Sequence, residues 1–186
     1  MDPIRNETSR RLFFALWPDA ARRSALAAWQ PPLRELCGGS AMQPETLHAT
    51  LVFLGAVAEQ RMEALLLAAQ ETVARRFELK LTAAHYWGHN HIVYAAPEAT
   101  PPALAELVRE LERNLRRHRF PFEDRPYKPH VTLLRHAKWS DEPLPPMPAV
   151  CWPVGGFALV QSLGDAQGPH YEVLARFDAS NSRLLE

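Results

Sequence analysis

Two stretches of the chain, PETLHATLVFLG at residues 44–55 and RPYKPHVTLLR at residues 125–135, each contain the pattern His-x-Thr-Leu. In both stretches the pattern lies in an apolar run that is typical of a buried β-strand. Alternate side chains of a strand share one face, so the His and the Thr of each copy point the same way. We therefore expect two strands that each present an imidazole and a hydroxyl on one face and apolar side chains on the other.

The polar residues of the two copies indicate an active site. If the two strands line one cleft, His48 and His130 lie across it, with Thr50 and Thr132 on the same faces. One imidazole can be protonated while the other is neutral near pH 7, as acid–base catalysis requires. A single copy more often marks a structural histidine, whereas two copies in strand-like runs favour a catalytic pair.

The two copies resemble the motifs of the 2H phosphoesterase superfamily, and more narrowly those of the RNA 2′,3′-cyclic phosphodiesterases, historically called 2′-5′ RNA ligases. The resemblance extends to RLFFALWP at residues 11–18, which is similar to the family's opening strand, and to HYEVLARF at residues 170–177, which is similar to its closing segment. It implies an α+β fold of two pseudo-symmetric lobes, each an antiparallel sheet with helices outside, around a central active-site cleft.

The resemblance also assigns roles to the polar residues of the motifs. It implies that His48 is the proton donor and His130 the proton acceptor, with the 3′-oxygen leaving and a 2′-phosphate formed. The hydroxyls of Thr50 and Thr132 can donate hydrogen bonds to phosphate oxygens and keep the imidazoles aligned. We expect these four side chains to carry the catalysis.

Two further residues are expected to bind substrate. The resemblance implies that Arg135 and Phe14 flank the terminal nucleobase, with the arginine also near the phosphate. Strict alternation from His130 places Arg135 on the opposite face, so it reaches the cleft only if the strand ends or bulges first. The alternative is a solvated arginine at a strand end and a phenylalanine in the core.

Strand and helix patterns alternate along the chain, and each half contributes strands, helical cover and one copy of the motif. We expect a single domain over residues 1–186 made of two intimately packed lobes, with residues 178–186 as a loose tail. Pro31-Pro32 is expected to break the first helix, and the strands at 78–83 and 91–94 to form a hairpin around Gly88. The other expected elements are strands at 10–16, 156–163 and 170–177, helices at 19–30, 62–73 and 100–115, and a loop at 137–153.

The composition of the chain limits the classes of ligand that we expect the protein to bind. Lys+Arg and Asp+Glu both count 21, so the formal net charge is zero, whereas proteins that bind long nucleic acids through phosphates are normally basic. We expect it to bind an RNA end or a small nucleotide with a 2′,3′-cyclic phosphate, and we expect neither a membrane nor an obligate protein partner. Cys37 and Cys151 are expected to be buried thiols in a reducing compartment. Because the first residues have no apolar signal core, we expect a cytoplasmic protein.

The expected function is hydrolysis of a terminal 2′,3′-cyclic phosphate on RNA to a 2′-phosphate, without metal or other cofactor. The reverse chemistry, which joins RNA ends through a 2′-5′ bond, is the expected side activity. His89 and His91 lie beside Gly88, and no carboxylate or cysteine near them completes a metal site. Two alternatives stay open: a 2H enzyme acting on small cyclic nucleotides or 2′-5′ oligonucleotides, and a non-catalytic module that binds RNA ends.

Overall fold

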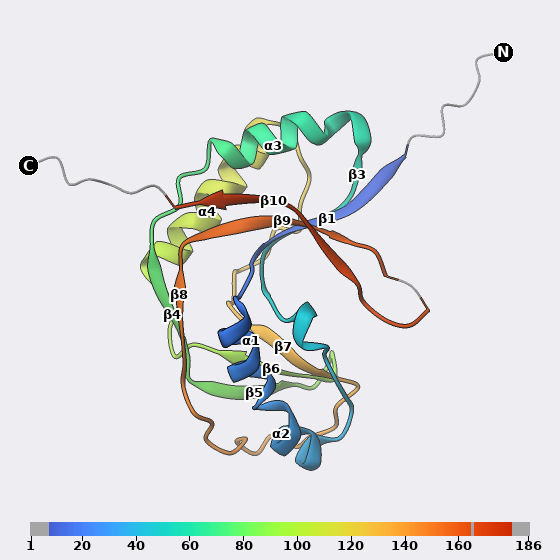
Figure 1. Ribbon diagram of the computed structural model, residues 1–186, viewed down its shortest axis with the longest axis vertical. Helices are drawn as coiled ribbons and strands as arrows, with labels where there is room; N and C mark the ends of the chain where they lie inside the picture. Colours follow the sequence, from blue (N-terminus) through green and yellow to red (C-terminus); the bar gives the residue numbers. More distant parts are fainter. Residues whose placement is uncertain (1–7, 165, 180–186) are drawn as a thin grey trace, which may run out of the picture.

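The two motif strands lie in two different antiparallel sheets. The computed structural model describes residues 8–164 and 166–179, and Figure 1 shows the two sheets one above the other. In what we call the β3 sheet, the strand order is β10-β9-β1-β3, and in the β7 sheet it is β2-β7-β6-β5. The strands are β1 (Ser9–Leu16), β2 (Ser40–Ala41), β3 (Ala49–Ala58), β5 (Ala83–Trp87), β6 (Ile92–Ala96), β7 (Val131–Arg135), β9 (Gly156–Ser162) and β10 (Tyr171–Asp178).

The helices lie outside the sheets. In Figure 1, α3 (Met62–Gln70) and α4 (Pro102–Arg117) accompany the β3 sheet, and α1 (Ala20–Ala27) and α2 (Gln30–Cys37) accompany the β7 sheet. The side chain of Asp19 caps α1 as expected, accepting a hydrogen bond from the Arg22 backbone at 2.9 Å. Pro31-Pro32 was expected to break this helix. The pair occupies the first turn of a second helix, α2, where proline is tolerated. Short 3₁₀ turns, η1 (Pro44–Thr46) and η2 (Glu59–Arg61), flank β3.

Neither lobe is a continuous half of the chain, contrary to the expectation from the sequence. The chain leaves the β3 sheet after β1 and returns for β3, and the β7 sheet receives β5, β6 and β7 later. The stretch expected to be a loop at 137–153 contains the start of β8 (Val150–Val154), which pairs with β4 (Phe77–Leu81). The hairpin around Gly88 is formed by β5 and β6. The preceding strand, β4, is therefore free to form a separate two-stranded ribbon with β8. Figure 1 shows the ribbon running along one side of both lobes.

The end of the chain is only partly the loose tail that the sequence suggested. Asp178 is the last residue of β10, and Ala179 is buried, with its backbone N–H donating to the Gly155 carbonyl at 2.8 Å. Residues 180–186 lie outside the described residues.

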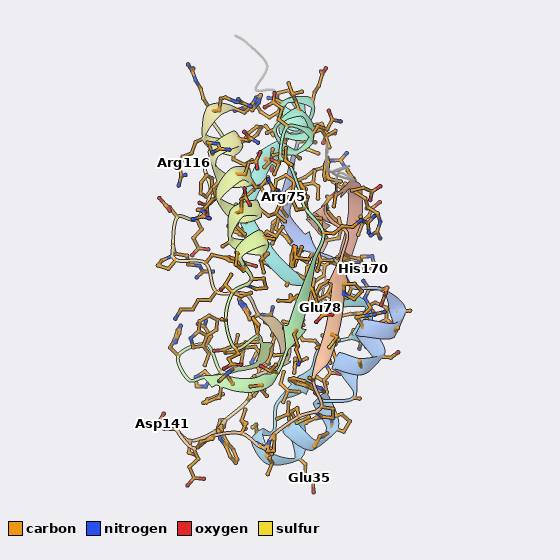
Figure 2. The ribbon with its side chains drawn as sticks, turned by 90° about the vertical axis from the view of Figure 1, so that its left-hand side faces the viewer. Glu35, Arg75, Glu78, Arg116, Asp141 and His170 are labelled. Atoms are coloured by element: carbon orange, nitrogen blue, oxygen red, sulfur yellow. The ribbon has the colours of Figure 1, made fainter. Side chains whose placement is uncertain are left out.

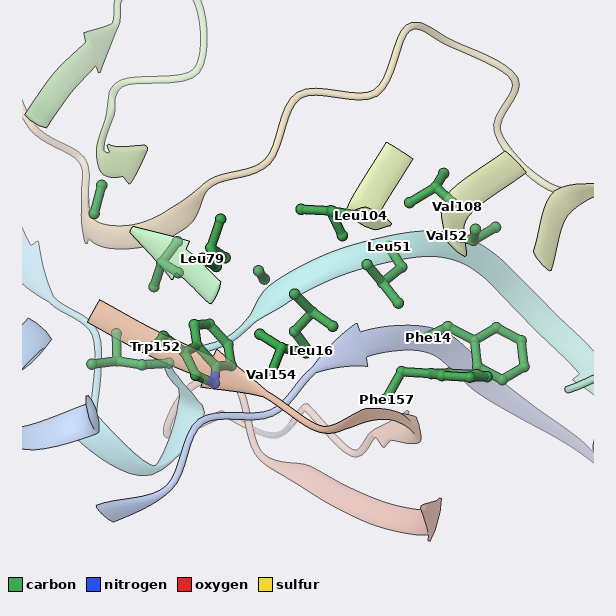
Figure 3. Packing of buried hydrophobic residues seen from close by; sticks show 14 of the residues in the cluster. Phe14, Leu16, Leu51, Val52, Leu79, Leu104, Val108, Trp152, Val154 and Phe157 are labelled. Carbon is green, nitrogen blue, oxygen red and sulfur yellow. The ribbon is translucent and has the colours of Figure 1, made fainter. Parts of the chain in front are cut away.

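One hydrophobic core connects the two lobes. Figure 3 shows side chains of β1 and β3 packed against α4 and against the β8 and β9 region. The periodic apolar residues of α4, including Leu104 and Leu111, are fully buried, as expected for an amphipathic helix. Charged side chains such as Glu35, Arg116 and Asp141 project outward in Figure 2. The two sheets are therefore fixed relative to each other by shared apolar contacts.

Both motif strands contain a β-bulge directly after the threonine. In β3, Thr50 pairs with Ala15 and Val52 with Phe14, so Leu51 is the extra residue. In β7 the register shifts in the same way, with Leu133 as the extra residue. A bulge lets two successive side chains face the core, and Leu51 and Val52 are indeed both buried. The residue three places after each threonine therefore returns to the face of the histidine.

The bulge in β7 is secured by a buried glutamine. Gln30, at the start of α2, donates from Nε2 to the carbonyls of Leu133 at 3.0 Å and of Met42 at 2.9 Å. The Met42 backbone N–H also donates to the Leu133 carbonyl at 2.9 Å. One side chain thus joins the helix, the bulge and the segment that leads to the first motif.

Replacing Gln30 should destabilise the protein measurably. We expect Gln30→Ala to lower the free energy of unfolding by about 1–3 kcal/mol, because the Met42 carbonyl is left buried without its partner. Urea unfolding followed by circular dichroism measures this change. The exposed Gln70 of α3 provides the control, and Gln70→Ala should change stability by less than about 0.5 kcal/mol. Equal effects of the two substitutions would contradict the role given to Gln30.

Candidate active site

A cavity of about 280 Å³, called here the central cleft, is lined by side chains of both motifs. His48 and Thr50 come from the β3 sheet side, and His130 and Thr132 come from the β7 sheet side. The bulged strands thus bring together two pairs of residues, His48 with His130 and Thr50 with Thr132. The members of each pair are about 80 positions apart in the sequence. Arg135 lines the same cleft. The cleft therefore brings the two motif imidazoles and the two motif hydroxyls together with the guanidinium of Arg135.

His48 is held on both ring nitrogens. Its Nδ1–H donates to the Thr46 carbonyl at 2.7 Å, and its Nε2 lies 3.1 Å from the Thr50 hydroxyl. Aromatic rings fix the plane of the imidazole: Trp17 stacks on it with centroids 5.6 Å apart, and Tyr171 meets it edge-on at 5.1 Å. Because Nδ1 carries its proton toward a carbonyl, proton exchange with a ligand takes place at Nε2.

Burial makes the charged form of His48 unfavourable when the cleft is empty. The pKa of His48 is lowered to about 4, chiefly by desolvation, although the hydrogen bond to the Thr46 carbonyl acts in the opposite direction. Positive charge on His130, Arg135 and Arg23 contributes to this lowering. Arg23 sits over the Trp17 ring at 5.1 Å, on the ring that stacks against His48. The empty cleft therefore holds a neutral His48 near pH 7.

One ring nitrogen of His130 forms a hydrogen bond within the protein, and the other is available to a ligand. Its Nδ1–H donates to the Lys128 carbonyl at 2.8 Å, which leaves the lone pair of the neutral ring on Nε2. Trp87 and Tyr94 meet the ring at large interplanar angles, with centroids 5.3 Å and 5.6 Å away. Burial lowers the pKa of His130, the Lys128 carbonyl raises it, and the charge of Arg125 lowers it. A neutral imidazole in this tautomer is suited to accept a proton.

Arg135 lies in the cleft because of the bulge in β7. Strict alternation would have placed it on the core face, but the extra residue Leu133 returns it to the face of His130. Its Nε lies 3.3 Å from the Met42 sulfur, a weak acceptor. The guanidinium therefore retains most of its capacity to bind an anion such as phosphate.

The expected position of Phe14 in the cleft was wrong. Phe14 is fully buried and packs edge-on against Phe157, with ring centroids 5.9 Å apart. The preceding residue of the same strand, Phe13, lines the cleft and lies 5.0 Å from the His48 ring. Successive strand residues face opposite sides, so the aromatic pair Phe13-Phe14 places one ring in the cleft and one in the core.

Besides Phe13, two further aromatic side chains that the sequence did not predict line the cleft. Phe53 occupies the same place after the first motif that Arg135 occupies after the second, and it lines the cleft for the same reason. The signal in the sequence is the apolar pair that follows each threonine, Leu51-Val52 in the first motif. Tyr171 of β10 also lines the cleft, and its position was visible only as part of the closing strand.

Several smaller expectations can be compared with the structure. Cys37 is buried, but Cys151 is exposed, because Val150 and Trp152 of the same strand face the core. Over residues 8–164 and 166–179, no helix is both long and apolar enough to cross a membrane. Within the same ranges, no three His, Cys, Asp or Glu side chains are grouped so that they could hold a metal ion.

Comparison with known proteins gives one consistent result. Residues 17–166 match the model of the 2′-5′ RNA ligase superfamily. The chain is 36% identical to an RNA 2′,3′-cyclic phosphodiesterase of Thermus thermophilus, over 90% of this chain and 89% of the relative. It is 32% identical to the protein of the same name from Escherichia coli, over 77% and 80% of the two chains.

A solved structure confirms the predicted fold. The crystal structure of E. coli LigT complexed with 3′-AMP superposes with a TM-score of 0.82 and 29% identity, covering 93% of this chain and 99% of that chain. The α+β architecture of antiparallel sheets in two lobes, which the family resemblance implied, is therefore correct. On the match of the family model and on both relatives, the chain belongs to the 2′-5′ RNA ligase superfamily.

Proposed function

We propose that this protein is an RNA 2′,3′-cyclic phosphodiesterase that converts a terminal 2′,3′-cyclic phosphate into a 2′-phosphate. The observation that carries the proposal is the set of groups around the central cleft, in which His48, His130 and Arg135 line one cavity. Relatives that cover most of the chain bear this name. The cleft supplies each of the groups that opening a cyclic phosphodiester requires.

The two histidines have different roles. His130 accepts a proton from the attacking water at Nε2, because its Nδ1–H is held by the Lys128 carbonyl. His48 donates a proton from Nε2 to the departing 3′-oxygen on the other side of the phosphorus. During this step Nε2 exchanges its contact with Thr50 for one with the leaving oxygen. The products are a 2′-phosphate and a free 3′-hydroxyl.

The negative charge of the substrate raises the pKa of His48 and so favours its protonated form. The empty cleft lowers the pKa of His48 to about 4, so this residue is neutral before substrate binds. A cyclic phosphodiester carries one negative charge, and an anion next to an imidazole raises its pKa. The proton donor is therefore formed when the phosphate occupies the cleft.

The remaining groups stabilise the transition state and bind the nucleoside. The guanidinium of Arg135 and the hydroxyls of Thr50 and Thr132 line the same cavity and can donate hydrogen bonds to the non-bridging oxygens, where negative charge increases. Phe13 and Tyr171 provide aromatic surface beside His48. A base stacked on such surface gains about 1–3 kcal/mol with little dependence on its identity.

Removing either histidine should abolish most of the activity. We expect His48→Ala and His130→Ala each to lower kcat by about 10²–10⁴-fold, the usual contribution of one general acid or base. Thr50→Ala and Thr132→Ala should have smaller effects, because water can partly replace a hydroxyl donor. Turnover of an RNA with a terminal 2′,3′-cyclic phosphate measures these changes, with the product phosphate located by NMR.

The exposed His170 provides the control for these variants, and His170→Ala should retain the activity of the unmodified protein. The two roles are separated by a substrate with a much better leaving group at the 3′ position, which needs no proton. This substrate should restore turnover to the His48 variant only. Selective rescue of the His130 variant would show that the assigned roles are reversed.

Hydrolysis should not require a divalent cation. Two imidazoles supply proton donation and acceptance, and Arg135 supplies a permanent positive charge for the phosphate. We expect kcat to stay within about twofold after dialysis against EDTA, measured on the cyclic-phosphate RNA. Loss of activity that a divalent ion restores would overturn this mechanism.

The pH profiles of kcat and kcat/KM should reveal that bound substrate favours protonated His48. Activity needs protonated His48 and neutral His130, so both kcat and kcat/KM should be bell-shaped in pH. Because bound phosphate raises the pKa of His48 from its low value in the empty cleft, the alkaline limb of kcat should lie at higher pH than that of kcat/KM. Steady-state kinetics between pH 4 and 9 test this. Coincident alkaline limbs would contradict the proposal.

A further inference from the structure

The central cleft carries more positive charge than a single cyclic phosphate requires. Arg11 and Arg135 both line this cleft, and none of the described residues that line it is acidic. Arg135 comes from β7, whereas Arg11 comes from β1 in the β3 sheet, so the two guanidinium groups belong to different lobes. A 2′,3′-cyclic phosphate is a monoanion, and Arg135 can bind it beside the second motif. Arg11 has no role in the proposed mechanism.

Arg11 lies farther out than the histidines, on the same wall of the cleft as His48. It stands two residues before Phe13 in β1, and alternate residues of a strand share a face about 7 Å apart. The Phe13 ring contacts His48, with centroids 5.0 Å apart, whereas Arg11 is exposed. In Figure 1, β1 begins at the outside of the molecule and runs inward between β9 and β3. Arg11 therefore lies toward the mouth of the cleft.

The guanidinium of Arg11 is oriented by stacking. It lies over the Phe53 ring, with its central carbon 4.9 Å from the ring centroid. Stacking uses the face of a guanidinium and leaves the N–H donors at its edge available. Within residues 8–164 and 166–179, the Arg11 side chain has no hydrogen bond or ion pair. These donors are therefore available to a ligand.

The neighbouring arginine of the same strand differs in this respect. The edge of Arg10 is bound by the Glu59 carboxylate, which accepts hydrogen bonds from Nε at 2.6 Å and from Nη2 at 2.9 Å. Arg10 does not line the central cleft. Of these two adjacent guanidinium groups, only that of Arg11 is thus placed to bind an anion that enters the cleft.

The end of an RNA strand offers a second anion one ribose away from the first. In the terminal nucleotide the cyclic phosphate is attached to O2′ and O3′, and the phosphodiester to the preceding nucleotide is attached to O5′, on the other side of the sugar. When the cyclic phosphate lies between the histidines, this 5′-phosphate is the next negative charge. Ser162, which pairs with Tyr171 between β9 and β10, adds a hydroxyl to the same wall of the cleft.

We propose that Arg11 binds the 5′-phosphate of the terminal nucleotide and thereby makes the enzyme select RNA ends over nucleoside 2′,3′-cyclic phosphates. This inference rests on the proposed function and adds a specificity-determining residue to it. Arg135 binds the phosphate that reacts, whereas Arg11 binds one that does not. A group that does not react is bound equally well before and during the reaction, so it lowers KM and leaves kcat unchanged.

Two substrates that differ only in the 5′-phosphate test the proposal. The full-length protein is assayed with adenosine 2′,3′-cyclic phosphate and with the same nucleotide carrying a 5′-phosphate. We expect kcat/KM to be at least about tenfold higher for the 5′-phosphorylated substrate, the contribution of one hydrogen bond between charged groups, and we expect the difference to lie in KM. The readout is the ratio of the two kcat/KM values, because a change in folding or in proton transfer affects both substrates and cancels.

Arg11→Gln keeps most of the side-chain length but removes the charge. It should lower this ratio by at least about fivefold, because kcat/KM falls for the 5′-phosphorylated substrate much more than for the other. Arg135→Gln should lower kcat/KM for both substrates alike, since Arg135 binds the phosphate that they share. Arg10→Gln is the matched control, and it should leave the ratio within about twofold of that of the unmodified protein, because it removes only an exposed ion pair.

Three outcomes separate this inference from the proposed function. A ratio near one for the unmodified protein overturns the role of Arg11 and leaves the proposed function standing. Equal losses on both substrates in the Arg11→Gln variant have the same meaning, because Arg11 would then act on the cyclic phosphate itself. Absence of hydrolysis of either substrate, and of an RNA ending in a 2′,3′-cyclic phosphate, by the unmodified protein overturns the proposed function.

Discussion

One extra residue in each motif strand determines what the central cleft contains. The bulge at Leu51 and the bulge at Leu133 let two successive apolar side chains enter the core. Each motif then presents a histidine directly before the strand, a threonine two residues later and a third side chain three residues after that. The third side chain is Phe53 in one lobe and Arg135 in the other. The same backbone device thus supplies aromatic surface on one wall and positive charge on the other.

The bulges require support from elsewhere in the fold. A bulge leaves backbone groups outside the regular ladder, and the Leu133 carbonyl is satisfied by Gln30 of α2 and by the Met42 backbone. Met42 leads through η1 to the Thr46 carbonyl that fixes His48. A helix of one lobe, the bulge of the second motif and the base of the first motif are therefore parts of one hydrogen-bonded unit.

The burial that orients His48 also controls its charge. The aromatic rings of Trp17, Phe13 and Tyr171 exclude water from the imidazole and fix its plane. The same exclusion of water disfavours the imidazolium, so in the proposed mechanism His48 becomes a proton donor only beside an anion. In that mechanism, orientation and substrate-dependent protonation have one physical cause. His130 differs because its committed Nδ1–H leaves Nε2 free to accept a proton.

The sequence by itself determined the features that follow from local periodicity: His48 and Thr50 on one strand face, the same arrangement for His130 and Thr132, and the amphipathic helix α4. Only the tertiary structure decided that Arg135 enters the cleft, that Phe14 lies in the core, and that β4 pairs with β8 between the lobes. A bulge changes which face a residue occupies without changing its identity, and strand pairing over long separations depends on the packing of the whole chain. The low pKa of His48 also depends on the tertiary structure, because the rings that bury this imidazole come together only in the folded chain.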